Sequence, residues 1–432
     1  MDHDYDVIIA GGGPAGSSTA NFLRQKGRTV LVLEREKFPR FHIGESLLPF
    51  ANDVWKELGV LDAMDQMFIH KPGALFVHEE SGAEFTYYFD TAIRPGRPYA
   101  FQVKRAELDQ LLLDKARSLG ADVREQHKVL DVSFLDEGVV VSALGPEGAL
   151  EARAAMFVDA TGRDALLCNR RQLKEPDGLV TTNVAVHCIF QDVERPAGID
   201  DGNIIIGLFD GGWWWLIPFK DGDTSVGMVF EKTFSKANRG LNAEEMFKAG
   251  VAACPHLSRR MAQAKPRMPV GSQGNWSYRA KQFYGERMLL VGDAAAFVDP
   301  LFSTGVLFAV NGAKFAAEHI DSALTDGDFR AERFVAYQQQ CIAGMDIFKS
   351  LVHEFYAENL RKVLMASARN ATVCSAITSM LAGDVYKPSM WHSIVKKGFS
   401  HVADVRGVPG VKSSRELLAQ KAVRPPRTVP ST

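Results

Sequence analysis

A glycine-rich turn between two short apolar runs constrains the fold of this chain more than any other feature. The run 5–10 leads into Gly11-Gly12-Gly13-Pro14-Ala15-Gly16, a helical pattern follows to Lys26, and a second apolar run covers residues 29–34. An apolar run, a glycine turn, a helix and another apolar run predict a βαβ unit with two parallel strands. The chain is therefore expected to build a parallel sheet from this unit.

The spacing within the turn is that of a dinucleotide-binding site. Gly11, Gly13 and Gly16 permit a tight turn and a close backbone approach, and the N-terminus of the helix that contains Ala15 faces a pyrophosphate. Glu34, at the end of the second run, is placed to accept hydrogen bonds from a ribose. The combination predicts a dinucleotide cofactor but does not choose between FAD and NAD.

The rest of the chain alternates between helical and strand patterns. Leucines recur at helical spacing over residues 105–119, short strands broken by Gly and Asp follow over 129–157, and 181–229 is rich in strands. Residues 287–291 predict one more strand of the parallel sheet, and the chain after residue 306 is mostly helical in pattern. These patterns predict an α/β fold.

Composition limits the class of protein. A chain of 432 residues with 46% hydrophobic and 24% charged residues predicts two interlocked domains with an appendage. The net charge of -2 indicates neither a nucleic acid nor an anionic membrane surface as a partner. The Pro-rich residues 424–432 are expected to be disordered.

The cysteines and apolar stretches indicate a reduced, cytoplasmic protein. The five cysteines are widely spaced without a C-x-x-C pair, so we expect no disulfide framework and no metal site. The apolar stretch from Val7 lacks the basic region and cleavage site of a signal peptide. The stretch 288–310 is interrupted by Asp293 and Asp299, so it is not expected to span a bilayer.

Two later segments resemble the flavin signatures of the aromatic-hydroxylase superfamily, and this resemblance favours FAD. They are Val158-Asp159-Ala160-Thr161-Gly162-Arg163 and Leu290-Val291-Gly292-Asp293-Ala294-Ala295-Ala296-Phe297-Val298-Asp299-Pro300. The resemblance implies that Gly162 contributes to the FAD site and that Asp293 holds the ribityl chain. It also implies that the turn at Pro300 presents backbone N–H groups to the isoalloxazine.

Arg105, at the start of a predicted helix, resembles the arginine that meets the FAD phosphates in that superfamily. The alternative is a solvated arginine at a helix start. No second Gly-x-Gly-x-x-Gly suited to NAD(P)H follows, and Asp159-Ala160-Thr161-Gly162 does not match the Asp-Gly pair of single-component hydroxylases. We therefore expect a separate reductase to supply FADH2.

The run Trp213-Trp214-Trp215-Leu216-Ile217-Pro218 fits the W-x-W-x-I-P motif of flavin-dependent halogenases. The resemblance implies that Trp213, Trp215 and Pro218 form cavity walls that keep the substrate from the flavin. The structural alternative is a strand at a sheet face with two core indoles, and both readings can hold together.

Lys71, in Phe68-Ile69-His70-Lys71-Pro72-Gly73-Ala74, matches the position of the halogenase lysine, between the first helices and a strand at residues 75–77. A lysine in a loop is more often a solvated surface charge. The resemblance implies that reduced flavin, O2 and chloride or bromide give hypohalous acid. Lys71 would then bind it as an ammonium, or react with it as an amine, and so direct the halogen to one ring carbon.

The resemblance places the halide beside Phe302-Ser303-Thr304-Gly305, where the N–H groups of Thr304 and Gly305 would bind it. Ser303 or Thr304 is also expected to cap the following helix. The core Gly44-Glu45-Ser46-Leu47 resembles a flavin-facing loop of halogenases. His42, just before it, either touches flavin or is a structural histidine, and the second reading is favoured slightly.

The resemblance covers residues 6–386 and is strongest to halogenases of phenolic and pyrrolic substrates in natural-product biosynthesis, several of which act on groups tethered to a carrier protein. Tryptophan halogenases have a glutamate where this chain has Phe302, and they carry a large insertion that it lacks. Free tryptophan is therefore not the expected substrate.

The resemblance also gives domain limits. The FAD-binding domain, a Rossmann-like parallel sheet with a β-meander, is predicted at 1–75, 100–180 and 275–330. A substrate-binding sheet domain is predicted at 76–99 and 181–274, and a helical C-terminal region with a disordered tail at 331–432.

Two other functions remain open. A flavin monooxygenase, a dehydrogenase or a geranylgeranyl-reductase-like enzyme would share the flavin segments without needing Lys71 or the tryptophan motif. A flavoprotein that only binds a carrier domain or a pigment precursor is less favoured, because the glycine turn and Lys71 are both intact.

Overall fold

The computed structural model describes residues 3–94, 96–176, 183–274, 277–366, 370–386, 391 and 412–423. Residue contacts divide the chain into two compact units: unit 1 is 1–68, 103–180 and 276–350, and unit 2 is 69–102, 181–275 and 351–432. The sequence places domain changes near residues 75 and 100, whereas contacts place them at 68/69 and 102/103. The region 331–432, expected to be separate, is divided between the units at 350/351.

Unit 1 is built on a sheet with the strand order β19-β20-β10-β1-β2-β7. Strands β20, β10, β1, β2 and β7 are parallel, and β19 is antiparallel to β20. The predicted α/β fold with a parallel, Rossmann-like sheet is confirmed. The bounds are β1 (Tyr5–Ala10), β2 (Val30–Leu33), β7 (Asp122–Arg124), β10 (Gly148–Asp159), β19 (Tyr284–Gly285) and β20 (Met288–Leu290).

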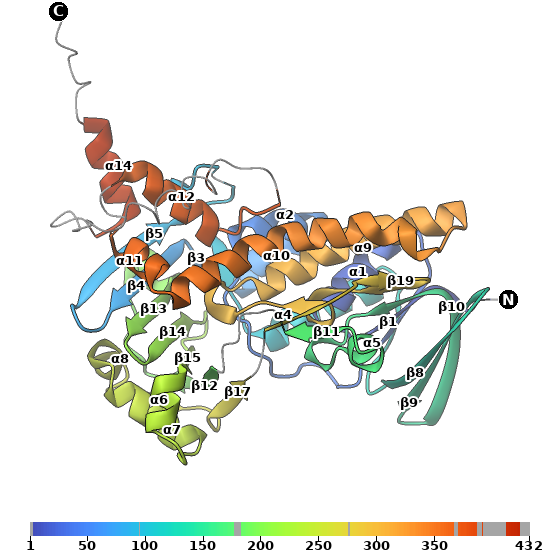
Figure 1. Ribbon diagram of the computed structural model, residues 1–432, viewed down its shortest axis with the longest axis horizontal. Helices are drawn as coiled ribbons and strands as arrows, with labels where there is room; N and C mark the ends of the chain where they lie inside the picture. Colours follow the sequence, from blue (N-terminus) through green and yellow to red (C-terminus); the bar gives the residue numbers. More distant parts are fainter. Residues whose placement is uncertain are drawn as a thin grey trace, which may run out of the picture. The chain divides into compact units, whose positions relative to one another are not determined.

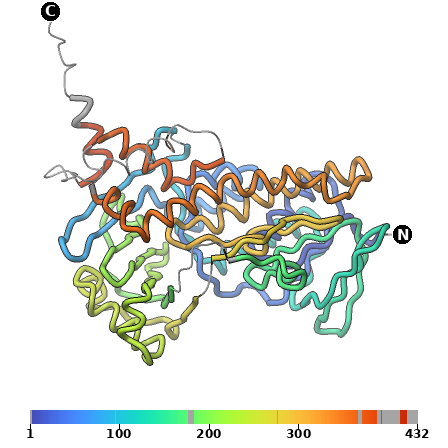
Figure 2. Tube along the Cα trace, in the orientation of Figure 1, coloured from blue at the N-terminus to red at the C-terminus, as the bar shows by residue number. Residues whose placement is uncertain are grey.

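The predicted β-meander extends this sheet. Strands β8 (Lys128–Leu135) and β9 (Gly138–Gly145) pair antiparallel with each other and β9 pairs with β10; Figure 2 shows the three strands as long neighbouring runs of the trace. A separate sheet of unit 1 has the order β11-β18-β21, with the bounds Lys174–Pro176, Tyr278–Ala280 and Ala296–Phe297.

Helices α1 and α4 contact strands of the parallel sheet, and α1 packs against both α4 and α9 (Figure 1). The α-helices are α1 (Pro14–Gln25), α2 (Asn52–Glu57), α3 (Leu61–Met67), α4 (Arg105–Ser118), α5 (Leu166–Arg170), α9 (Gly305–Asp326) and the first part of α10 (Val335–Tyr356). The 3-10 turns are η1 (Pro49–Ala51), η3 (Gly162–Asp164), η5 (Gly292–Ala294), η6 (Pro300–Phe302) and η7 (Ala331–Phe334).

Unit 2 is built on a largely antiparallel sheet with the order β16-β12-β15-β14-β13-β4-β5, and β17 also pairs with β12. Among the described strands of this sheet, β13 and β4 are parallel and the other pairs are antiparallel. A two-stranded sheet joins β3 to β6. The bounds are β3 (Ile69–Lys71), β4 (Gly73–His78), β5 (Ala83–Tyr88), β6 (Ala100–Gln102), β12 (Val184–Gln191), β13 (Ile204–Phe209), β14 (Gly212–Pro218), β15 (Thr224–Phe230), β16 (Lys265–Pro266) and β17 (Gly271–Gly274).

One face of this sheet packs against helices α7 and α8 through a buried cluster that includes Trp214, Phe230, Phe247 and Leu257. The elements of unit 2 besides the strands are η2 (Phe89–Thr91), η4 (Gly198–Gly202), α6 (Lys232–Ala237), α7 (Ala243–Ala252), α8 (Pro255–Arg260), the end of α10, α11 (Asn359–Ala366), α12 (Ala371–Leu381) and α14 (Ser414–Val423).

Throughout the described part of the chain, no helix combines the length and the apolar character needed to cross a bilayer. All five cysteines are buried and free. The tail 424–432, expected to be disordered, lies outside the described residues.

Candidate functional site

The glycine turn of unit 1 has the backbone geometry that its sequence predicts. Gly11 has φ +102°, and a Cβ there would lie 2.3 Å from the carbonyl oxygen of Ala160; a Cβ on Gly16 would lie 1.9 Å from the carbonyl oxygen of Gly11. Both positions therefore need glycine for packing. Gly13 differs, because its φ is -67° and a Cβ there would meet, among the described residues, just Arg40 Nη2 at 3.5 Å. The fold leaves room at Gly13, at the N-terminus of α1.

Glu34 lies against this turn. Its Oε2 accepts the N–H of Gly12 at 2.6 Å and its Oε1 accepts the N–H of Glu36 at 2.8 Å, and the side chain is buried. A carboxylate has further lone pairs after accepting two hydrogen bonds, so Glu34 can still accept hydroxyl groups of a ribose.

Turn η5 brings Asp293 to the start of α1. Gly292 has φ +65°, and a Cβ there would lie 2.9 Å from the Cβ of Ala15, so η5 sits directly against the glycine turn. Burial raises the pKa of Asp293 to about 6, against the opposing effect of Arg105 and Arg163. Within the described residues no hydrogen bond to its carboxylate is found, which leaves this carboxylate available to hydroxyl groups of a ligand.

The loop after β10 is shaped by Asp159. This fully buried carboxylate accepts the N–H and the hydroxyl of Thr161, at 3.0 and 2.6 Å, and the N–H of Leu167 at 2.7 Å. Burial nevertheless raises its pKa. The loop carries Gly162 at φ +63°, where no atom of the described residues lies within 4 Å of a Cβ. Asp159 therefore stabilises the loop after β10, and Gly162 in that loop faces open space.

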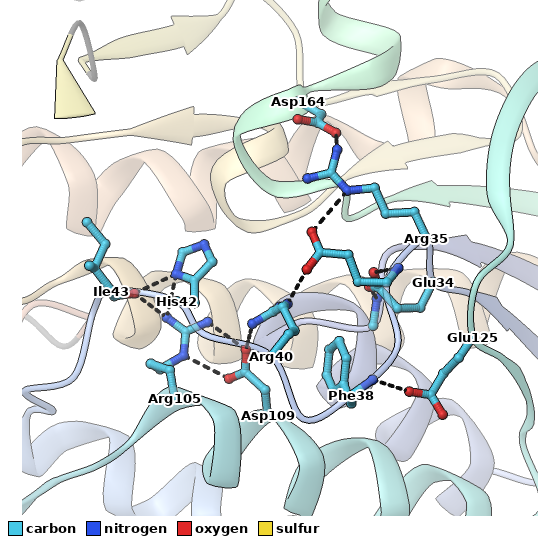
Figure 3. A network of polar contacts seen from close by, with 12 residues as sticks. Glu34, Arg35, Phe38, Arg40, His42, Ile43, Arg105, Asp109, Glu125 and Asp164 are labelled. Carbon is cyan, nitrogen blue, oxygen red and sulfur yellow. Dashed lines mark hydrogen bonds and ion pairs between the residues drawn. The ribbon is translucent and has the colours of Figure 1, made fainter. Parts of the chain in front are cut away.

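Arg105 begins α4, as predicted, but it is buried, which excludes the solvated alternative. Its Nε and Nη2 donate to Asp109 at 2.8 and 2.9 Å and its Nη1 donates to the carbonyl oxygen of Ile43 at 2.9 Å, as Figure 3 shows. Burial acts to raise the pKa of Asp109, but the guanidinium of Arg105 outweighs it and the pKa is lowered. Asp109 is therefore an anion that holds the guanidinium in place.

Two residues that interact around Arg105, Asp109 and Arg40, were not predicted from the sequence. Asp109 also accepts a hydrogen bond from Nη1 of Arg40 at 2.8 Å (Figure 3). The other terminal nitrogen of this guanidinium, Nη2, is the atom beside Gly13. Asp109 lies one helical turn after Arg105, which is a usable signal for an ion pair within α4. Arg40 has no such signal in the sequence, because it lies in a loop that only the folded unit brings next to α4.

His42 belongs to the same cluster. Its Nδ1 lies 2.5 Å from the carbonyl oxygen of Ile43, so this nitrogen carries the proton and Nε2 is an acceptor. Burial, together with the charge of Arg105, lowers the pKa of His42 to about 4, so the ring is neutral at neutral pH. Its hydrogen bond to Ile43 supports the structural reading.

The groups of unit 1 fit a flavin dinucleotide. The open N-terminus of α1 and a guanidinium nitrogen of Arg40 suit phosphates, and the carboxylates of Glu34 and Asp293 suit hydroxyl groups of ribose and ribityl. The individual roles of the glycines, Ala15, Arg105, Gly162 and Pro300 stay predictions.

The predicted halide site is at the start of α9, where Pro300 opens η6 and Ser303 takes a left-handed conformation at φ 57°. Thr304 is the N-cap residue, but neither its side chain nor that of Ser303 caps the helix, so the predicted side-chain cap is wrong. The reason is that Thr304 has helical φ and ψ, -85° and -15°, which point its side chain away from the N–H groups of the first turn.

The N–H groups of Thr304 and Gly305 have no acceptor among the residues described, and the first turn of α9 has no acidic residue. Such a helix start attracts a small anion. Halide binding by these two groups stays a prediction.

In unit 2, Lys71 ends the short strand β3, which pairs with β6 so that Lys71 lies opposite Ala100. The sequence places Lys71 between the first helices and a strand, as observed, but does not predict β3, which forms by pairing with a segment far along the chain. Lys71 is 2% exposed, and its Nζ lies 5.4 Å from the centroid of the Phe89 ring. A solvated surface lysine is excluded.

The packing around β3 explains this burial. A Cβ on Gly202 of η4 would lie 1.8 Å from the carbonyl oxygen of His70, so η4 lies against β3, and Gln102 Nε2 donates to the Gly202 carbonyl at 3.0 Å. Burial lowers the pKa of Lys71 to about 7. At neutral pH the site therefore holds both the ammonium and the free amine.

This burial predicts a pH-dependent stability. The unfolded chain keeps the Lys71 proton up to its ordinary pKa near 10.5, whereas the folded protein releases it near 7, so the free energy of unfolding rises with pH between these values. Relative to Lys71→Met, the wild type should gain about 2 kcal/mol between about pH 6.5 and about pH 8.5. Urea unfolding followed by tryptophan fluorescence measures this; a difference that is constant with pH would contradict it.

The three adjacent tryptophans lie on β14 and are all buried. Trp213 and Trp215 share one face, with ring centroids 5.8 Å apart. A Cβ on Gly227, opposite Trp215 on β15, would meet the Trp215 ring at 2.1 Å, so this indole lies flat over a glycine. Trp213 Nε1 donates to the Tyr356 hydroxyl at 3.2 Å and Trp215 Nε1 to Ser225 Oγ at 3.3 Å. The two indoles form an aromatic face of β14, whereas Pro218, buried at the end of the strand, alternates with Trp214.

Trp214 points to the other face, into the core, over Gly207 of β13. Its Nε1 donates to Glu79 Oε1 at 2.8 Å, and the Glu79 carboxylate also accepts the N–H groups of His256 and Leu257 at the start of α8. Glu79 was missed, because its partners are distant in sequence. It ties the middle tryptophan to the N-terminus of a helix, where a carboxylate is favoured.

Comparison with known proteins gives a consistent family. The sequence model of the tryptophan halogenase family matches residues 6–97 and 89–363. A chlorinase of Pseudomonas fluorescens, named for 1H-pyrrole-2-carbonyl groups on a peptidyl-carrier protein, is 34% identical over 409 residues, which are 89% of this chain and 90% of the relative.

Solved structures of other proteins have the same fold. The flavin-dependent brominase Bmp2 superposes with a TM-score of 0.81 at 28% identity, over 92% of this chain and 98% of that one. A flavoprotein/dehydrogenase from Cytophaga hutchinsonii superposes with a TM-score of 0.85, also at 28% identity and with the same coverage.

Proposed function

Since this chain belongs to the tryptophan halogenase family and is a flavin-dependent halogenase that acts on an aromatic substrate, we propose that this substrate is a pyrrolic or phenolic ring tethered to a carrier protein. The observation that carries this proposal is the 34% identity, over nine-tenths of its length, to the relative named for a carrier-bound pyrrole. Phe302, in place of the glutamate of tryptophan halogenases, argues against free tryptophan.

FAD is the cofactor; in its reduced form, with O2, it supplies the oxidising power that converts chloride or bromide to hypohalous acid. Gly13, Arg105 and Asp293 would hold it at the phosphates and the ribityl chain. The N–H groups of Thr304 and Gly305 would hold the halide. A separate flavin reductase would deliver the reducing equivalents.

Lys71 would receive the hypohalous acid. As an ammonium it donates a hydrogen bond to the oxygen, which leaves as water when the halogen replaces a ring proton. As a free amine it takes the halogen onto Nζ with loss of water, and transfers it to the ring carbon as the ring proton is released. The pKa near 7 makes both forms available. Trp213, Trp215 and Pro218 would wall the cavity, and positioning of the ring sets the regiochemistry.

The test compares substrates. Holoenzyme with FAD, a flavin reductase, NADH and bromide is given pyrrole-2-carbonyl on a carrier protein, free pyrrole-2-carboxylate, a phenol and free tryptophan. We expect the tethered acyl group to be halogenated at least about tenfold faster than the free acid, because the carrier contributes binding energy. Equal rates on tethered and free acid, or a preference for tryptophan, would overturn the proposed substrate.

The similarity to the flavoprotein/dehydrogenase from Cytophaga hutchinsonii is a reason to look in the same assay for the products of two other activities. A dehydrogenase or a monooxygenase would give a desaturated or hydroxylated product without halogen. The buried Lys71 favours the halogenase, because neither of these reactions requires a lysine at this position.

A further inference from the structure

The ring of Phe89 covers Lys71, and its position is set by the short turn η2. Phe89 is 2% exposed, its ring centroid lies 5.4 Å from Lys71 Nζ, and its N–H donates to the Pro72 carbonyl at 2.9 Å. The turn thus touches the Lys71 segment through both its backbone and its ring. Whatever fixes η2 therefore also fixes the environment of the lysine.

Three buried hydroxyl groups hold η2: Thr91 of the turn, Thr378 of α12 and Ser414 of α14, here called the hydroxyl cluster. Thr91 Oγ1 lies 2.9 Å from Ser414 Oγ and 3.3 Å from Thr378 Oγ1, and it donates to the Tyr88 carbonyl at 2.7 Å. Ser414 Oγ also accepts the N–H of Tyr88 at 2.9 Å. Loss of a buried partner leaves such groups unsatisfied, which is costly.

Ser414 belongs to a C-terminal segment that lies beside β5 in the fold. The N–H of Thr86 donates to the Lys412 carbonyl at 2.9 Å, and the guanidinium of Arg415 lies 4.0 Å from the Tyr88 ring centroid. The neighbouring Ser413 serves α14 itself, because its Oγ accepts the N–H of Glu416 at 3.3 Å. The two adjacent serines therefore have different contacts: Ser413 caps α14, and Ser414 contacts the turn η2 beside Lys71.

We propose that Ser414 is a positioning residue for Lys71: through the hydroxyl cluster it holds η2 so that Phe89 keeps water from the lysine and fixes its Nζ. This rests on the proposed role of Lys71. The beginning of the C-terminal helix is then part of the halogenating site, although it carries no reacting group. A shift of about 1 Å at a reacting group is enough to lower a rate by up to about a hundredfold.

Variants of neighbouring residues are expected to differ in product yield. Ser414→Ala and Thr91→Val remove a hydroxyl of the cluster, Thr91→Ser keeps it, and Ser413→Ala loosens only the start of α14. We expect Ser414→Ala and Thr91→Val to lower halogenated product per FADH2 consumed by about tenfold. Thr91→Ser and Ser413→Ala should stay near the wild type, and all four should bind FAD as the wild type does.

Hydrogen–deuterium exchange gives a readout that does not depend on catalysis. The Phe89 N–H should exchange about tenfold faster or more in Ser414→Ala and unchanged in Ser413→Ala, because only the first frees η2. Unchanged exchange and product in Ser414→Ala, or equal losses in Ser413→Ala, would overturn the proposal. If Lys71→Met retains its product, the proposed role of Lys71 fails instead; if Lys71→Met loses it while Ser414→Ala keeps it, only the positioning role fails.

Discussion

Replacing Lys71 with methionine is expected to abolish halogenation while FAD still binds. Methionine is an unbranched side chain of similar length, so it can occupy the buried position of Lys71 beside Phe89 while lacking the amine. Product formation should fall by at least about a hundredfold, as for loss of a positioned catalytic group. The dissociation constant of FAD and the reoxidation of the bound flavin by O2 should be unchanged.

The matched control is Lys236→Met, which removes an exposed lysine of α6 in the same unit. It should halogenate as the wild type does. Product from Lys71→Met at the wild-type rate would remove Lys71 from the mechanism, and loss of FAD from this variant would show that the lysine is needed for folding or cofactor binding.

A valine at Gly13 is expected to eliminate FAD binding without unfolding the protein. The backbone at Gly13 has an ordinary negative φ, and among the described residues only Arg40 Nη2 comes near a Cβ, at 3.5 Å. The valine methyl groups would then occupy the space at the N-terminus of α1 that the pyrophosphate needs. The dissociation constant of FAD should rise by about a hundredfold or more, since the phosphates lose several hydrogen bonds to N–H groups at once.

Two other glycine variants serve as controls for Gly13→Val. Gly16→Ala should lower the stability of the protein itself, because its Cβ would lie 1.9 Å from the Gly11 carbonyl oxygen. Gly96→Val should leave both FAD binding and stability as they are, because a Cβ at Gly96 has no neighbour within 4 Å in the described part of the chain. A Gly13→Val protein that purifies with its flavin would show that the pyrophosphate binds elsewhere.

Local patterns were sufficient for the parallel sheet. The first strand and the helix after the glycine turn were predicted within a residue or so, because apolar periodicity, Pro14 and the glycines all lie within one short segment. The tryptophan motif was likewise placed on a strand, with its glycine partners lying directly opposite on β13 and β15. In these places local preference and packing agree.

The environment of the candidate residues could not be predicted in this way. The strand of Lys71 exists because Ile69 pairs with Gln102, and its burial depends on η4, much later in the chain. The contact of Arg40 with Asp109 joins a loop to a helix, and Ser414 reaches η2 from the C-terminal helix. Such contacts depend on topology, which periodicity within a segment does not encode.

The most direct test of the central claim is the mass spectrum of the product. Wild-type holoenzyme, a flavin reductase with NADH, O2, bromide and the carrier-tethered pyrrole should give an acyl group that shows the bromine isotope doublet, and the doublet should be missing with Lys71→Met. A wild-type product that has gained oxygen or lost hydrogen, without bromine, would contradict the assignment as a halogenase.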